Sequence, residues 1–244
     1  PTYGDLNISA SGTASWPHDF SNDASHMEIF RYNGINVQQI SFNGLSNQAP
    51  RSNALGDLAW MKMNFNVSPW VSHMMLLSDA GVIQITEQDN QRGPVDINDL
   101  RQVVWWESGE GIVLWDAGII STIVPGGRNP RVNNHTDVVY MLWDNAASKW
   151  YTWIRAGNKD YRLSDPLHTS AGGDINDQKE IAWREIINDF GDTAVFMLRR
   201  IGPKGDFNHD CHVDVVDVRA FQWCFTGQTM PSEELMAGCH RGDF

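Results

Sequence analysis

The chain has 244 residues, 41% of them hydrophobic, which is enough for one large domain or for a domain with a small appendage. Its formal net charge of −12, with no cluster of Lys and Arg, argues against nucleic acid as a partner. No apolar run approaches the roughly 20 residues that a membrane-spanning helix needs, so we expect no transmembrane segment.

Short apolar segments separated by turn residues predict many β-strands. Asn33 and Gly34 lie between two apolar segments, 27–32 and 35–42, and predict a tight hairpin. Between Ala59 and Val67 apolar and polar residues alternate, as in a strand with one apolar face. Further strands are expected at 74–77, 81–86, 102–106, 111–115, 119–124, 138–143, 150–156 and 196–201.

One segment fits two kinds of element. Over residues 177–190, Ala182, Ile186 and Phe190 have helical spacing and Asp177 can cap a helix, but a strand over 181–187 fits equally well. Both possibilities remain open at this point.

The order of the elements predicts the fold class. Many short strands, with no alternation of strands and helices and no apparent repeat, predict a mainly β protein built as an antiparallel β-sandwich, a jelly roll. This architecture resembles concanavalin-like and laminin-G-like jelly rolls. We expect the sandwich over 1–201, a Gly- and Pro-containing linker over 202–205, and an appendage over 206–244.

Residues 206–217 have the spacing of a calcium-binding loop. Oxygen-bearing side chains occupy loop positions 1, 3, 5, 9 and 12, and position 7 supplies a main-chain carbonyl. The predicted Ca²⁺ ligands are Asp206, Asn208, Asp210, His212, Asp214 and Asp217. An apolar stripe over 218–225 predicts a helix after the loop.

This loop and helix resemble a type I dockerin repeat over 205–244, of the kind found in secreted planctomycete proteins. Dockerin repeats occur in pairs, and 241–244 repeat the pattern of 204–207, so we expect the second repeat to be truncated. Cys211 departs from the pattern where a glycine is usual, and Asp217 where an EF-hand has glutamate. The resemblance implies a secreted or cell-surface protein that assembles with a cohesin-like receptor or with itself.

The chain has three cysteines, all near its end. Cys224 and Cys239 bracket a segment rich in turn residues, and we predict a disulfide between them. Cys211 is then free, inside the ion loop.

Eleven tryptophans suggest two roles for their side chains. Some could form an exposed platform that stacks on carbohydrate, but all become core if both faces of their sheet are covered. The platform candidates are Trp105, Trp106, Trp115, Trp150 and Trp153.

Four weaker patterns carry both a functional and a plain interpretation. His168 could be a catalytic base or surface, and Glu107 with Glu110 could be a glycosidase pair or hairpin acids. The loop 126–131 could meet an anionic polymer or be a turn. A second calcium corner could be formed by Asp96, Asn98 and Asp99.

These patterns favour a secreted, non-catalytic module whose β-sandwich binds polysaccharide or a neighbouring extracellular protein, with a calcium-stabilised appendage for assembly. A polysaccharide-degrading hydrolase or lyase is the second hypothesis. A structural subunit of a surface layer or filament is the third.

Overall fold

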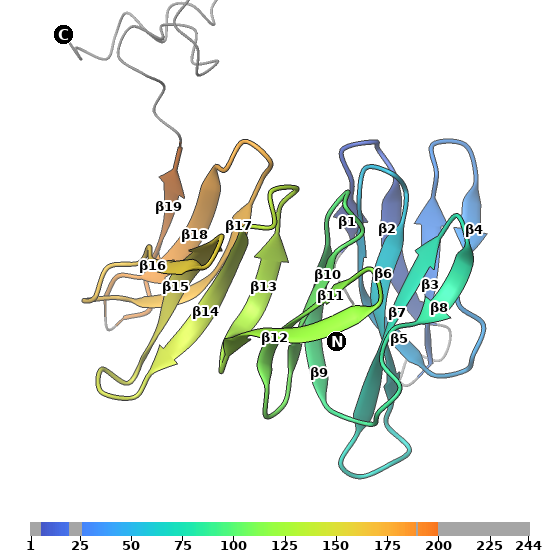
Figure 1. Cartoon of the computed structure of the whole chain (residues 1–244), viewed down its shortest axis with the longest axis horizontal. Helices are drawn as coiled ribbons and strands as arrows, with labels where there is room; N and C mark the ends of the chain where they lie inside the picture. The colour runs from blue at the N-terminus through green and yellow to red at the C-terminus, as the bar shows by residue number, and fades with distance from the viewer. Residues whose placement is uncertain (1–5, 20–25, 189, 200–244) are drawn as a thin grey trace, which may run out of the picture. The chain divides into compact units, whose positions relative to one another are not determined.

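The computed structural model describes residues 6–19, 26–188 and 190–199, which form β-strands joined by turns and contain no helix. The strands form five small antiparallel sheets that follow one another in chain order, and within each sheet a strand pairs with the next one along the chain (Figure 1). The first sheet is β1 (Asn7–Ile8), β2 (Ala14–Asp19), β3 (Met27–Tyr32) and β4 (Val37–Gln39). The second is β5 (Ser46–Ser52), β6 (Leu58–Asn64), β7 (Val71–Ser78) and β8 (Gly81–Gln84).

The later sheets repeat this plan. The third is β9 (Arg92–Ile97), β10 (Val103–Glu107), β11 (Gly111–Asp116) and β12 (Ile119–Pro125). The fourth is β13 (Arg128–Val132), β14 (Val138–Asp144), β15 (Lys149–Ala156) and β16 (Lys159–Arg162). The fifth has three strands among the described residues, β17 (Thr169–Ile175), β18 (Ile181–Ile186) and β19 (Thr193–Leu198).

Most of the predicted strands overlap strands of the structure, but the first strands of the second to fifth sheets, β5, β9, β13 and β17, were not predicted. The segment 177–190, for which helix and strand were both open, contains a strand. Residues Ile181–Ile186 form β18, which pairs with β17 through Ile175 and Ile181 and through Thr169 and Ile186. The sheet ladder therefore overrides the helical spacing of the apolar residues.

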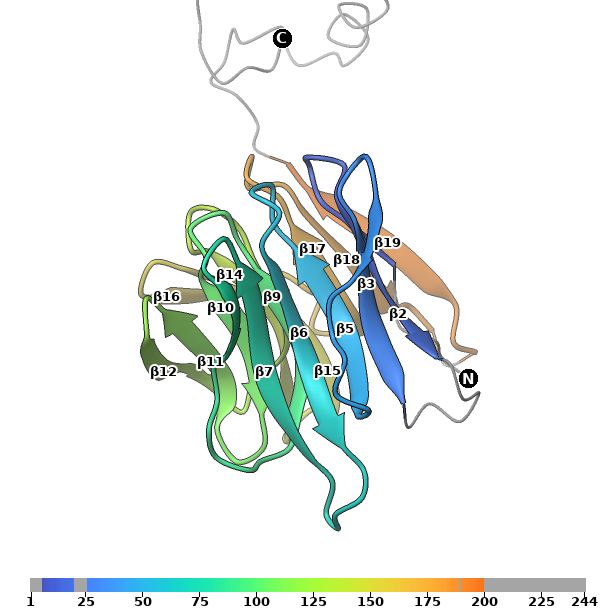
Figure 2. The same ribbon diagram turned by 90° about the vertical axis from the view of Figure 1, so that its right-hand side faces the viewer.

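The five sheets, called blades 1 to 5, pack face to face in series rather than as two opposed layers. The first strand of each blade contacts the first strand of the next, and the blades follow one another in Figures 1 and 2 from blue to orange. Successive four-stranded antiparallel sheets with their first strands innermost are the arrangement of a β-propeller. The predicted jelly-roll sandwich is therefore wrong. The predicted helical appendage over 206–244 lies outside the described residues.

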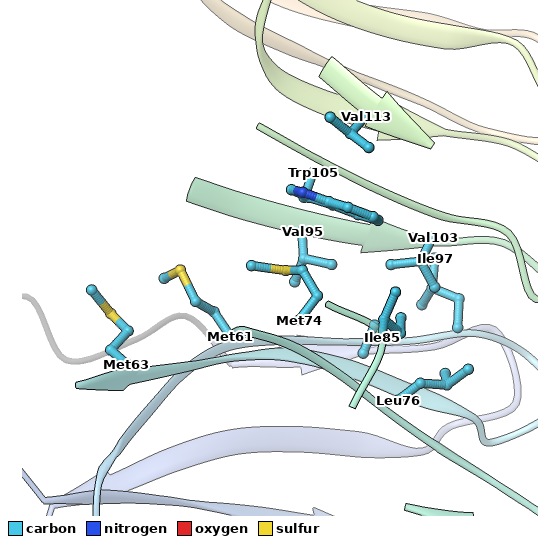
Figure 3. Packing of buried hydrophobic residues seen from close by; sticks show 11 residues of the cluster. Met61, Met63, Met74, Leu76, Ile85, Val95, Ile97, Val103, Trp105 and Val113 are labelled. Atoms are coloured by element: carbon cyan, nitrogen blue, oxygen red, sulfur yellow. The ribbon is translucent and has the colours of Figure 1, made fainter. Parts of the chain in front are cut away.

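The blades are held together by apolar layers between them. The largest layer joins Met61, Met74 and Leu76 of blade 2 to Val95 and Trp105 of blade 3 (Figure 3). A second lies between blades 3 and 4, and a third between blades 1 and 2. Because burying each such side chain contributes about 1.5–3 kcal/mol, these layers dominate the stability of the domain.

The described residues include no helix long and apolar enough to span a bilayer.

Candidate functional site

A turn of the same construction joins the first and second strands of blades 2 to 5. Each turn opens with an asparagine whose Oδ1 accepts main-chain N–H groups of its own turn; the Oδ1 of Asn98 accepts from Leu100 at 3.1 Å and from Gln102 at 2.9 Å. The amide group of each also donates to the side chain that closes the turn. The four residues are Asn53, Asn98, Asn133 and Asn176. These bonds fix the turns without help from water.

The same asparagines tie neighbouring blades together. The Nδ2 of Asn53 donates to the carbonyl of Asn98 at 3.0 Å, and that of Asn98 to the carbonyl of Asn133 at 2.9 Å. The Nδ2 of Asn133 in turn donates to the carbonyl of Asn176 at 3.2 Å. These partners lie 45, 35 and 43 residues apart in the chain, so the ladder sets the register between blades.

The residue two positions before each turn projects from the first strand of its blade toward one shared cavity. Including the matching residue of blade 1, these residues form what we call the channel ring: Asn7, Arg51, Asp96, Arg131 and Asp174. The cavity that they line has a volume of about 440 Å³. Five strands far apart in the sequence thus place alternating basic and acidic side chains around one depression.

Asp96 is the half-buried carboxylate of the ring. Its Oδ2 accepts the main-chain N–H of Val132 at 2.9 Å. Burial raises the pKa of Asp96 above its ordinary value, although Arg131, this hydrogen bond and Arg51 pull in the opposite direction. Because burial outweighs these opposing effects, the net shift of the pKa of Asp96 is upward.

A second layer of polar residues forms the rim of the cavity. Asp99 accepts the main-chain N–H of Ala54 at 2.6 Å, and Asn134 accepts that of Asp99 at 2.6 Å. Asp177 accepts the main-chain N–H of Asn134 at 2.7 Å, and the Nδ2 of Asn134 bridges the two aspartates. The rim is therefore a rigid acidic edge that links blades 2 to 5.

The lining of the cavity offers charged and amide side chains to a ligand. Its lining residues are Asn, Asp, Gln, Arg and small or aliphatic residues, without Ser, Thr, Cys, His, Lys, Tyr or Glu. All four carboxylates, Asp96, Asp99, Asp174 and Asp177, accept a main-chain N–H. Aspartate is therefore the residue type in this lining that can act as a base or nucleophile, and each of the four carboxylates is already engaged by a main-chain N–H.

The predicted second calcium corner falls in this cavity but has a different role. Asp96 and Asp99 bind main-chain N–H groups, and Asn98 holds its turn and the neighbouring blade. Among the described residues no group of three or more His, Cys, Asp or Glu side chains is arranged to hold a metal.

The predicted tryptophan platform is not formed as one surface. Trp105 is fully buried and donates from Nε1 to Glu107 at 2.9 Å. Trp115 packs on the layer between blades 2 and 3, and Trp153 on the layer between blades 3 and 4. Only Trp106 and Trp150 lie together, through the side chain of Arg128.

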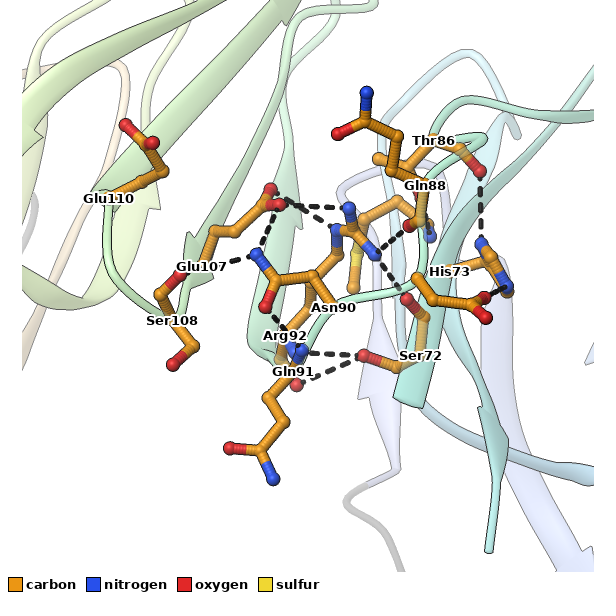
Figure 4. A network of polar contacts seen from close by, with 12 residues as sticks. Ser72, His73, Thr86, Gln88, Asn90, Gln91, Arg92, Glu107, Ser108 and Glu110 are labelled. Carbon is orange, nitrogen blue, oxygen red and sulfur yellow. Dashed lines mark hydrogen bonds and ion pairs between the residues drawn. The ribbon is translucent and has the colours of Figure 1, made fainter. Parts of the chain in front are cut away.

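The two glutamates proposed as a catalytic pair have separate partners. Glu107 forms an ion pair with the buried Arg92 at 2.8 Å and accepts from Asn90 at 2.9 Å (Figure 4). Glu110 accepts instead from the hydroxyl of Thr122 at 2.8 Å.

His168 contacts the buried Glu185 at 3.0 Å, and Glu185 also accepts from Trp183. The two arginines of the loop 126–131 lie in different places. Arg128 stacks on indole rings, and Arg131 belongs to the channel ring.

The calcium ligands predicted over 206–217 and the Cys224–Cys239 disulfide lie outside the described residues. They stay predictions, as does the extracellular location that depends on them.

No protein-family model and no curated protein sequence matches the chain. Among solved structures it is similar to TolB from Acinetobacter baumannii, with a TM-score of 0.58 and 10% identity over 80% of this chain and 51% of that one. It is also similar to a putative TolB from Agrobacterium tumefaciens, with a TM-score of 0.58 and 13% identity over 81% and 76% of the two chains. A puromycin-hydrolyzing peptidase of Mycobacterium tuberculosis gives a TM-score of 0.55 and 10% identity over 81% and 36%.

These likenesses support the propeller-type fold. The chain spans about half the length of the Acinetobacter baumannii TolB. They also correct the resemblance drawn from the sequence, because these three neighbours are TolB and peptidase structures and not dockerins, jelly rolls or carbohydrate-binding modules. The secreted carbohydrate-binding module inferred from that resemblance is therefore not supported.

Proposed function

We propose that the described domain is a non-catalytic binding domain whose channel ring and rim receive a basic segment of a protein partner. The observation that carries the proposal is the convergence of ring residues from all five blades on one cavity. Four carboxylates and two guanidinium groups line it, so the cavity is acidic on balance, as is the whole chain. A lysine- or arginine-containing segment complements such a surface and is steered to it.

The rigidity of the site favours the same function. The asparagine ladder and the rim hold the main chain around the cavity in hydrogen bonds between blades. A site fixed in advance loses little conformational entropy when it binds, so a few charged contacts are sufficient for measurable affinity. Arg51 and Arg131 of the ring repel other cations. A ligand made only of cationic groups is therefore disfavoured deep in the cavity, beside these two side chains.

Charge-specific peptide binding tests the proposal. Short fluorescein-labelled peptides in which lysine, glutamate or serine alternates with glycine are titrated at pH 8 with the whole chain. We expect the lysine peptide to bind and the other two to bind at least about tenfold more weakly. Added salt should weaken the binding.

Two variants of opposite charge sharpen the test. Asp174→Asn removes a negative charge from the exposed part of the ring and should weaken the lysine peptide about threefold to tenfold. Arg131→Gln removes a positive charge and should strengthen it. Asp89→Asn and Arg162→Gln change charge outside the cavity lining and are the matched controls. Equal binding of the three peptides, or equal effects of the ring and control variants, would contradict the proposal.

A further inference from the structure

The side chain of Arg128 lies over two indole rings that come from different blades. Its Cζ is 4.9 Å from the ring centroid of Trp106, in β10, and 5.4 Å from that of Trp150, in β15. Arg128 is the first residue of β13, whereas the asparagine turn follows the last residue of that strand. This arginine therefore lies at the opposite end of blade 4 from the asparagine turns.

Arg128 differs from three other arginines of the described domain in its polar partners. Arg92, Arg101 and Arg155 each form an ion pair with a carboxylate. The exposed guanidinium of Arg128 has neither a hydrogen bond nor an ion pair with any of the described residues. Stacking on an indole leaves the N–H groups of a guanidinium in its plane, where they can meet an acceptor from outside.

A partly exposed indole packs against one of the two rings that hold this cation. The ring of Trp143 lies 5.3 Å from that of Trp150, centroid to centroid and tilted by 60°. Trp143 is 40% exposed, and its Nε1 is already bound to Asn145 at 3.0 Å. The accessible part of this indole is therefore mainly its apolar surface, next to the Trp150 ring on which the guanidinium also stacks.

From these contacts we infer that Arg128, Trp106, Trp150 and Trp143 form a binding site for a carboxylate carried on an apolar or aromatic group. A guanidinium donates two parallel hydrogen bonds to a carboxylate, and its orientation is set here by the two indoles. One stacked cation matches one negative charge, and Trp143 offers a surface for the apolar part. The site takes an anion at the end of the domain opposite the channel ring, so it is independent of the function proposed above.

Titration with a small aromatic acid and its neutral counterpart tests this site. The probes are 3-phenylpropionate and 3-phenylpropanamide, followed by tryptophan fluorescence and by NMR of the indole N–H groups. We expect the acid to bind with a Kd on the order of 1 mM and the amide at least about tenfold more weakly. N-acetylphenylalanine and its C-terminal amide then distinguish a peptide C-terminus from a free acid as the source of the carboxylate.

Variants separate the site from general effects on the fold. Arg128→Gln should weaken the acid at least about tenfold, and Arg128→Lys should weaken it too, because an ammonium group cannot form the paired bonds. Arg162→Gln is the matched control, since Arg162 is an exposed arginine stacked on a single ring, that of Tyr151, at 5.1 Å. Binding of the lysine peptide at the channel ring should stay unchanged in all three variants.

Three results would overturn the inference. They are equal binding of the acid and the amide, unchanged affinity in Arg128→Gln with the lysine peptide still bound, and tighter binding of inorganic phosphate than of either carboxylate. If Arg128→Gln does not fold, Arg128→Lys keeps the cation over the indoles and decides the question.

Discussion

The side-chain amide of Asn98 donates to the main-chain carbonyl of Asn133 across the boundary between blades 3 and 4, at 2.9 Å. Asn98 is also buried, and its Oδ1 accepts two N–H groups of its own turn. One side chain therefore closes a turn and joins two blades. Its removal leaves several buried polar groups without partners.

This dual role gives the first prediction. Asn98→Ala should lower the free energy of unfolding by about 2 to 3 kcal/mol, because it breaks the turn and the contact between blades. Asn176→Ala is the matched control, since Asn176 is exposed and its amide donates only to Glu180 within its own turn. We expect a loss of about 1 kcal/mol there. Urea unfolding followed by tryptophan fluorescence measures both, and equal losses would show that the ladder adds no stability.

The turn asparagines also belong to a sequence repeat that the sequence alone did not reveal. An asparagine followed four positions later by Asp, Gln or Glu opens the turns of blades 2 to 5. In each of these blades an aromatic residue then stands at the same position of the second strand. The residues in this set of aromatics are Trp60, Trp105, Tyr140 and Trp183. This repeat is hard to recognise in the sequence, because the distance between successive turns varies from 35 to 45 residues and the strands between them differ.

Many of the individual strands could be predicted because alternation and turn residues are local, but the first strands of blades 2 to 5, rich in polar residues, Gly or Pro, could not. Their assembly could not, because the alternation at Ala59–Val67 was interpreted as one covered face. In the structure Ala59 and Met61 belong to the apolar layer with blade 3, and Trp60 belongs to the layer with blade 1. Both faces of a middle blade are buried, which a two-layer sandwich does not require.

The candidate site was predictable only in part. Asp96, Asn98 and Asp99 were singled out because they cluster in the sequence, and all three line the cavity. Arg131 was noted only as part of a basic loop, and Asp174 not as a site residue. Their place in the ring depends on how the first strands of separate blades come together, which no local pattern contains.

Replacing a buried tryptophan should cost much more stability than replacing an exposed one. Trp105→Ala should destabilise the domain by about 3 to 5 kcal/mol, because it empties the layer between blades 2 and 3 and frees Glu107 from its indole partner. Trp143→Ala, at a side chain 40% exposed, should cost less than about 1 kcal/mol. Thermal and urea unfolding measure both, and a small effect at Trp105 would contradict the packing.

Two glycines of one hairpin differ in what surrounds them. A Cβ at Gly111, whose φ is +107°, would lie 2.3 Å from the main-chain N of Gly126 and from the O of Val124. At Gly109, with φ of +84°, there is open space. Gly111→Ala should therefore cost at least about 3 kcal/mol and Gly109→Ala about 1 kcal/mol, the difference being the collision with main-chain atoms. Urea unfolding of the two variants side by side tests this, and similar losses would show that the β12 end of the blade can move aside.

The ion pair between Glu107 and Arg92 makes stability depend on pH (Figure 4). Burial alone would raise the pKa of Glu107, but hydrogen bonds from Trp105 and Asn90 and the charge of Arg92 outweigh it, so the pKa lies below its ordinary value of 4.5. A carboxyl whose pKa is lower in the folded state stabilises that state above its unfolded pKa. This stabilisation is lost as the pH falls through the folded pKa.

Replacing this carboxylate should remove the acid-dependent part of the stability. At pH 7 Glu107→Gln should cost about 3 kcal/mol, because Arg92 is left buried without a counter-charge. The wild-type chain should then lose more of its free energy of unfolding between about pH 5 and pH 3 than the variant does. Glu110→Gln is the control, because Glu110 is exposed and binds only the Thr122 hydroxyl, so it should follow the wild-type curve. Unfolding in urea across this pH range measures all three proteins. Parallel curves for the wild type and Glu107→Gln would show that Glu107 has the same pKa in the folded and unfolded chain.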